Sequence, residues 1–173
     1  IQQFDIGVER TMFEDLLFGI RQLVDIALRA ISPAVNDPTT AMNCLHYLEN
    51  ILVQAAKHPD QQICHYNSEG NLCVVGRAVT FNAMLDLTFH QLRYYGCTDP
   101  IIVLQLLEIL THLAEEVDEE ERRAQLWNHA VLIRHHVNQR IDQQYDRELI
   151  NERLFQLAKL VDQEYGTIAL APQ

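Results

Sequence analysis

The sequence is poor in basic residues and in glycine, and it has no apolar run of membrane-spanning length. Thirteen lysines and arginines face 24 aspartates and glutamates, so the 173 residues carry a formal net charge of -11. A nucleic acid would therefore meet net repulsion, which argues against such a partner. The longest apolar stretch, residues 101–110, is interrupted by Gln105 and Glu108, whereas a membrane-spanning helix needs about 20 apolar residues.

Signatures of catalysis and of metal binding are also scarce. The eight histidines include His129, His135 and His136 in one segment, but no pair has the H-E-x-x-H arrangement of zinc enzymes. Six glycines leave little material for a phosphate-binding loop, and no G-x-S-x-G elbow occurs. We therefore predict no catalytic residue, no metal site and no cofactor, and we lean away from an enzyme without excluding one.

Cysteine is limited to four residues, with no C-x-x-C pair among them. They are too few for a disulfide scaffold, so free thiols in a reducing compartment are favoured. Cys64 and Cys73 flank a turn-like segment and could face each other across a hairpin, close enough to bridge. That alternative stays open at this point.

Apolar residues recur at helical spacing in six segments that proline, glycine and polar clusters separate. Two Asp-Pro pairs, at 37–38 and 99–100, mark helix starts in which aspartate is the N-cap and proline the first helical residue. Gly96 and Gly166 follow two segments where a left-handed C-cap is expected. The predicted helices cover residues 12–31, 38–57, 80–95, 100–117, 119–141 and 146–165.

Two shorter segments have the composition of strands. Residues 63–66 and 72–75 are rich in strand-forming side chains, and the turn-forming cluster 67–71 separates them. They predict a small β-hairpin inserted at about residues 61–76. The fold class is therefore all-α, a single helical bundle of about six helices with one inserted hairpin, forming one domain over residues 1–173. The segment 100–117 has the widest apolar face and is expected to be the central helix.

The first predicted helix combines a charged stripe with an apolar remainder. At 100° per residue, six polar residues lie within about 60° either side of Asp25: Arg10, Glu14, Arg21, Asp25, Arg29 and Ser32. One interpretation is a solvated ridge with weak ion pairs between residues four apart. The other places the stripe at an interface or in a polar cavity, where its charges need partners. The residues alone do not decide between them.

The corner at residues 32–40 is the most informative loop. Two prolines fix φ twice within six residues, and Asn36 tolerates unusual backbone angles. Asp37 and Thr40 gather oxygens at the exposed N–H groups of the second helix. Such helix starts bind anions, and Arg29 could supply a matching cation. Because Asp37 is itself an anion, we favour capping as its role.

The residues that form this helix and corner resemble a known family. Arg10-Thr11 and the run from Phe18 to Ala41 are similar to the bacterial predicted membrane proteins grouped as domain of unknown function 2254. Later residues agree too, namely Phe89, Gln91, Arg93, Tyr95, Gly96 and Asp99-Pro100, while Ala34 and Glu14 depart from the usual Gly and Gln. The resemblance implies a soluble region that follows several transmembrane helices. With Ile1 in place of a starting Met, the chain is interpreted as a piece excised from a longer protein of the bacterial inner membrane, on the cytoplasmic side.

Two hypotheses for the function follow. In the first, the domain assembles or gates the protein through homo-oligomerisation and couples to the protein's own transmembrane region. Arg21, Asp25, Arg29 and Asp37 would then organise an interface or an ion-facing vestibule. In the alternative, the domain senses a small molecule or a small anion, with a hydrolase as the weaker version. Its pocket would be built from Arg10, Arg29, Ser32, Asn36 and Thr40.

Overall fold

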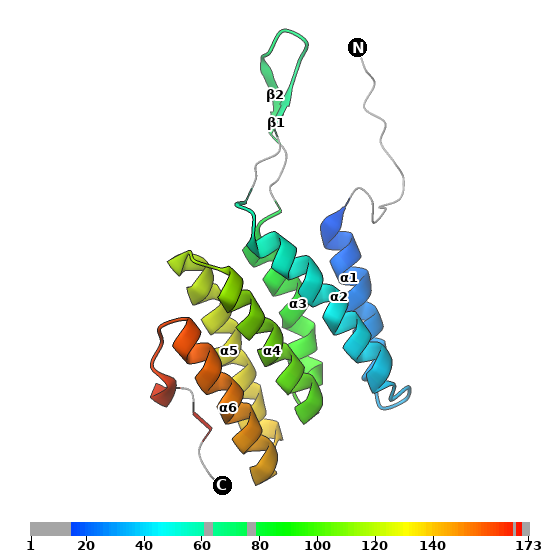
Figure 1. The fold of residues 1–173 in the computed structure, drawn as a ribbon. Coiled ribbons are helices and arrows are strands. Elements are labelled where there is room, and N and C mark those ends of the chain that lie inside the picture. Colours follow the sequence, from blue (N-terminus) through cyan, green and yellow to red (C-terminus); the bar gives the residue numbers. More distant parts are fainter. Residues whose placement is uncertain (1–14, 61–63, 76–78, 168, 171–173) are drawn as a thin grey trace.

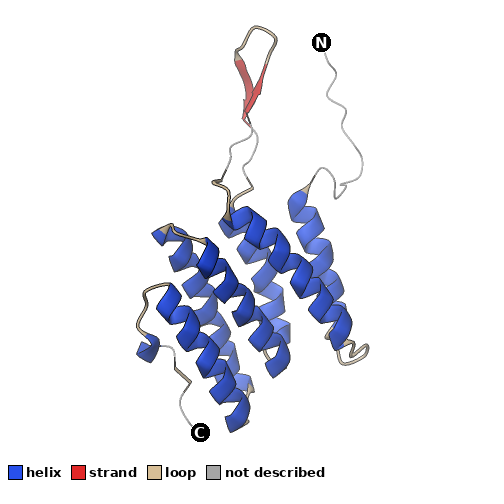
Figure 2. Cartoon of the chain, in the orientation of Figure 1, coloured by secondary structure: helices blue, strands red, loops and turns tan. Residues whose placement is uncertain are grey.

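The computed structural model of the chain describes residues 15–60, 64–75, 79–167 and 169–170. Six α-helices form a bundle from which a two-stranded hairpin projects (Figures 1 and 2), which confirms the predicted fold class. The elements are α1 (Leu16–Ala30), α2 (Pro38–Ala56), β1 (Cys64–Tyr66), β2 (Leu72–Val75), α3 (Phe81–Gly96), α4 (Pro100–Glu116), α5 (Glu120–Arg140), α6 (Gln144–Leu160) and a short 3-10 helix (Tyr165–Thr167).

Helix α4 is central, as its apolar sequence predicts. It packs against α2, α3, α5 and α6, whereas α1 packs only on α2 and α3 among the described elements. Helix α1 therefore lies at one edge of the bundle and α6 toward the other (Figure 1). Because of this position, the side of α1 that faces away from α2 and α3 has no helix of the described chain over it.

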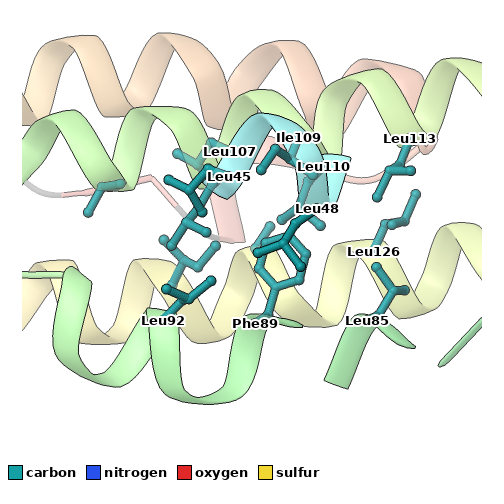
Figure 3. Packing of buried hydrophobic residues seen from close by; sticks show 14 of the residues in the cluster. Leu45, Leu48, Leu85, Phe89, Leu92, Leu107, Ile109, Leu110, Leu113 and Leu126 are labelled. Atoms are coloured by element: carbon teal, nitrogen blue, oxygen red, sulfur yellow. The ribbon is translucent and has the colours of Figure 1, made fainter. Parts of the chain in front are cut away.

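The core is continuous through the bundle. Leu45 and Leu48 of α2 approach Leu107 and Leu110 of α4, and Phe89 of α3 packs beneath them (Figure 3); all five side chains are fully buried. Full burial of a side chain of this size contributes about 1.5–3 kcal/mol. Burial of this kind holds the helices at fixed positions, so the polar groups on their outer faces are presented on a rigid scaffold.

Helix starts follow the sequence closely. Asp99 accepts a hydrogen bond from the Ile101 amide at 2.9 Å, as its Asp-Pro pair predicts. Thr80 caps α3 by accepting from the Ala83 amide at 3.1 Å. Helix α5 has no side-chain cap, but two glutamates occupy its first turn, where the helix dipole favours negative charge.

The structure corrects the roles predicted for two glycines. Left-handed backbone angles occur, among the described residues, at Asn36, Gly70 and Asp162. Neither Gly96 nor Gly166 is therefore a left-handed C-cap. Gly96 is instead the last residue of α3, and a Cβ atom there would lie 2.7 Å from Cγ2 of Ile102 in α4. Glycine at this position permits the close approach of the two helices.

The inserted hairpin is antiparallel and closes through Asn67. The Asn67 side-chain oxygen accepts from the amides of Glu69 and Asn71, and Gly70 has a φ of 80°. The register pairs Cys64 with Val75, so Cys64 does not face Cys73. All four cysteines are free thiols, as favoured from the sequence.

Arg122 of α5 joins the two ends of the hairpin insertion to the bundle. Its guanidinium donates to the carbonyls of Ala56 and His58 at 3.0 Å each and lies 3.4 Å from Oδ1 of Asp60. Asp60 in turn accepts from the amide of Phe81 at 2.8 Å, at the start of α3. The end of α2 and the start of α3 therefore meet at one buried arginine, even though the insertion separates them in the sequence.

The ion pair between His112 of α4 and Glu49 of α2 gives a pH-dependent contribution to stability. The hydrogen bond that the His112 imidazole donates to the Glu49 carboxylate is the main reason that the pKa of His112 is raised. A raised pKa in the folded state means that the stabilisation is present at acid pH, below the pKa of the unfolded chain, and is lost as the pH rises through the folded-state pKa. Urea denaturation of the parent chain should therefore show this extra stability below about pH 6 and its loss toward pH 8. Glu49→Gln should remove the dependence, and a Glu49→Gln variant with the same pH profile as the parent would contradict the assignment.

Candidate functional site

The candidate site begins on the outer face of α1. Ile20, Val24 and Ala27 are buried against the bundle, so the opposite side of the helix, with Asp25 and Arg29, is exposed to solvent. Neither Asp25 nor Arg29 forms an ion pair within the described residues, although they lie four residues apart. The weak pairs of the solvated-ridge interpretation are thus absent from the described part of the chain, where neither charge has an ionic partner.

Arg21 differs from these two because it lies half-buried against α3. Its Nη1 atom is 3.5 Å from Oε1 of Gln91, at the limit of a hydrogen bond. Arg21 also lines an open hollow of about 660 Å³ between α1 and α3, together with Ala83, Asp86, Leu87, His90 and Gln91. Asp86 and His90 were not predicted as site residues, because nothing in a single sequence shows that α3 lies beside α1.

Apolar side chains accompany the charges on this face. Ile26 is 47% exposed and lies beside Asp25. Val35, in the corner that follows the helix, is 52% exposed. A single exposed apolar residue is ordinary, but these residues occur on one edge helix and its adjoining corner. The outer face of α1, defined here by Asp25, Ile26 and Arg29, therefore combines unpaired charge with accessible apolar surface.

The corner at residues 32–40 satisfies its polar groups internally. The hydroxyl of Ser32 donates to the Arg29 carbonyl at 2.7 Å, and the Ser32 carbonyl accepts from the Val35 and Asn36 amides. The Asp37 amide donates to the Ala30 carbonyl at 2.9 Å, and Asn36 adopts a φ of 48°. The structure thus brings Arg29, Ser32, Asn36 and Asp37 into one compact turn.

Asp37 caps α2, as favoured from the sequence. One of its carboxylate oxygens accepts from the Thr40 amide at 3.0 Å, and the other accepts from the Thr40 hydroxyl at 2.6 Å. These hydrogen bonds to Thr40 lower the pKa of Asp37. Of the residues singled out from the sequence, Thr40 is therefore bonded to Asp37, while Arg10 and Glu14 lie outside the described residues.

The cap leads to a prediction for Asp37. Replacing it with alanine removes both acceptors, so the urea midpoint of unfolding should fall clearly, whereas Asp37→Asn and Asp37→Ser should retain most of the stability. Because the pKa of Asp37 is lowered in the folded state, its stabilisation is present above the pKa of the unfolded chain and is lost as the pH falls through the folded-state pKa. Equal losses for Asn and Ala would show that the carboxylate charge, not the cap, is what matters.

No group of three or more histidine, cysteine, aspartate or glutamate side chains within the described ranges is placed to hold a metal ion. The outer face of α1 thus presents one acid and one base that form no ion pair within these ranges, together with the exposed side chain of Ile26.

Together, fold and site define an all-α domain whose edge helix exposes an acid and a base that are not paired by any described residue. The chain belongs to the family of predicted membrane proteins of unknown function designated DUF2254, whose family model matches residues 1–112. The matched range contains α1, the corner at residues 32–40, α2, the hairpin, α3 and most of α4. None of the helices in the described part of the chain is long and apolar enough to cross a membrane.

Relatives extend the similarity to the rest of the chain. Uncharacterized proteins of Mycobacterium tuberculosis and Mycobacterium bovis are 31% identical to it over 175 aligned residues, which cover 99% of this chain. The alignment covers 33% of each relative, so the chain spans about a third of the length of the curated relatives that it matches. No solved structure matches the chain.

Proposed function

We propose that this chain is the cytoplasmic-side assembly or gating domain of a bacterial inner-membrane protein, and that it acts through homo-oligomerisation. The family supports the connection to a membrane protein, and relatives three times as long have room for a transmembrane region. The observation that carries the proposal is the outer face of α1, where Asp25 and Arg29 lie exposed on an edge helix and form no ion pair with any residue that the structure describes.

This face is self-complementary. Asp25 and Arg29 lie one turn apart on the same side of the helix. If two copies pair their α1 helices in antiparallel fashion about a twofold axis between these residues, each Asp25 lies opposite the partner's Arg29. The same contact covers Ile26, which is 47% exposed in the single chain. Two ion pairs and an apolar contact therefore form from one surface patch.

The charges would set the register more than the affinity. An exposed ion pair contributes about 0–1 kcal/mol, whereas like charges opposite each other cost several kcal/mol in an interface and exclude wrong arrangements. The apolar side chains on α1 and its corner would supply the favourable burial. A change in how the copies pair would move α1 relative to the α1 helix of the second copy. In the longer membrane protein, this movement would be transmitted to the transmembrane region.

Sedimentation at micromolar concentration tests the proposal. We expect concentration-dependent self-association of the parent chain, and we expect Asp25→Arg to raise the dissociation constant about tenfold or more because two like-charge contacts replace two ion pairs. The matched control is Glu152→Arg, which reverses an exposed acid on α6, at the far side of the bundle, and should leave association unchanged. A strictly monomeric parent chain, or equal behaviour of both variants, would refute the role of this face.

The sensing alternative has less support at the corner itself. A bound anion there would use the free amides at the start of α2, but the Asp37 carboxylate already accepts from the Thr40 amide and hydroxyl. An added anion would also face that carboxylate at close range. A thermal shift of the parent chain with small anions, absent in Arg29→Gln, would nevertheless favour the alternative over assembly.

A further inference from the structure

A second cluster of basic groups lies away from α1, where the last turns of α3 and α5 meet. Its centre is Arg93 of α3, which is only 9% exposed. The Nε atom of Arg93 is fully buried without an acceptor, and the guanidinium has no hydrogen bond or ion pair within the described residues. Enclosing most of a guanidinium with its Nε unpaired is costly, so an anion that binds the outer nitrogens of Arg93 would stabilise it.

The neighbours of Arg93 do not supply that anion. Cys97, one turn further on, is fully buried, and burial raises the pKa of its thiol to about 12, so it is neutral. Burial lowers the pKa of Arg93, and the negative charge of Asp86 opposes this lowering. The Asp86 side chain is nevertheless 63% exposed and has other partners: it lies 3.4 Å from Nε2 of His129 and accepts a hydrogen bond from the Asn82 side chain. The carboxylate on this side of α3 is therefore engaged elsewhere.

The other groups at this seam are cationic or can become so. Arg140 of α5 donates to the carbonyl of Tyr94, the residue that follows Arg93, and its guanidinium stacks over the Tyr94 ring at 5.1 Å. His136 contacts the same ring, and its Nδ1 atom lies 3.0 Å from the Leu132 carbonyl, while its Nε2 atom has no hydrogen-bond partner among the described residues. The positive charges of Arg93 and Arg140 both lower the pKa of the His136 imidazole, and both oppose the rise that burial causes in the pKa of the Cys97 thiol.

We propose that Arg93, Arg140 and His136 form a binding site for a phosphate group at the α3–α5 seam. Two guanidiniums offer forked donors that match the oxygens of a phosphate, and the imidazole adds a third donor when it is protonated. The site stands out in a chain whose net charge is -11. It is distinct from the outer face of α1, so the assembly proposal does not depend on it. The phosphate belongs either to a soluble molecule or to a lipid headgroup, and the two sources share this chemistry.

Titration of the histidine ring signals by NMR, with inorganic phosphate against chloride at equal ionic strength, tests the site directly. Burial is the main reason that the pKa of His136 lies below its ordinary value, and the neighbouring charges of Arg93, Arg140 and His135 lower it further. A bound phosphate offsets those charges, so phosphate should raise the pKa of His136. Arg93→Gln should weaken phosphate binding about tenfold or more, and Arg153→Gln, on α6, should not.

Two further arms make the result decisive. If Arg93→Gln does not fold, Arg140→Gln tests the same site from a more exposed position. Vesicles that contain phosphatidic acid, compared with phosphatidylcholine alone, separate a headgroup from a soluble phosphate. Binding to the acidic vesicles but not to free phosphate assigns the site to a lipid headgroup, and binding to free phosphate assigns it to a soluble molecule. Neither kind of binding, or binding that survives both arginine substitutions, overturns the proposal.

Discussion

Replacing Arg122 with alanine is expected to lower the free energy of unfolding by about 3 kcal/mol, the largest effect of any single substitution considered. The substitution leaves the Ala56 and His58 carbonyls without their donor and removes the ion pairs with Asp60 and Glu119. It also removes the cation–π contact with the ring of Phe81, whose centroid lies 5.0 Å away. These losses fall together at the base of the hairpin, so the end of α2 and the start of α3 should separate first.

Urea denaturation with two comparison variants checks this expectation. Arg122→Lys keeps the charge but lacks the forked donors, so it should recover less than half of the lost stability. Arg153→Ala removes an arginine that donates to the exposed Gln156 side chain and should cost about 0.5 kcal/mol or less. Equal midpoints for Arg122→Ala and Arg153→Ala would mean that the buried arginine does not hold the insertion.

Replacing Gly96 with alanine is expected to destabilise the chain by about 1–2 kcal/mol. The added Cβ would lie 2.7 Å from Cγ2 of Ile102, well inside the usual carbon–carbon separation of about 3.5–4.0 Å. Ile102 is buried and branched at Cβ, so its side chain has little freedom to move. Overpacking of this kind costs about 1–3 kcal/mol, and the better helix propensity of alanine offsets at most about 1 kcal/mol of it.

A double-mutant cycle isolates the contact. In an Ile102→Ala background the clash is removed, so Gly96→Ala should become neutral or stabilising. Gly166→Ala is the matched control, because a Cβ at Gly166 meets no atom within 4 Å. If Gly96→Ala costs the same in both backgrounds, the close approach of α3 to α4 is not the reason for glycine.

The number and order of the helices could be predicted because apolar periodicity and Asp-Pro starts are local signals. Helix ends were less predictable, since they depend on contacts with distant residues. Helix α6 was expected to reach residue 165 but ends at Leu160. Beyond it, Asn151 exchanges two hydrogen bonds with the backbone of Leu170, and Phe155 meets the ring of Tyr165. These contacts fold the following segment back along α6 and override its helical pattern.

The candidate site was predictable in its residues but not in its environment. The sequence identified Asp25, Arg29 and the cap formed by Asp37, yet the exposure of the first two follows from the edge position of α1, which no local pattern reveals. The burial of two arginines could not be predicted from the sequence either. Arg93 and Arg122 resemble ordinary surface charges in the sequence, and only the packing of α3 and α5 shows that they are enclosed.

Mixing two charge-reversed variants tests the central claim about α1 most directly. Asp25→Arg places two arginines opposite each other in the proposed contact, and Arg29→Asp places two aspartates there, so each variant alone should be largely monomeric. In a mixture, the two arginines of one chain face the two aspartates of the other, and sedimentation should show a heterodimer restored to roughly the parent affinity. A mixture that stays monomeric while the parent chain associates would contradict the account and place the interface elsewhere.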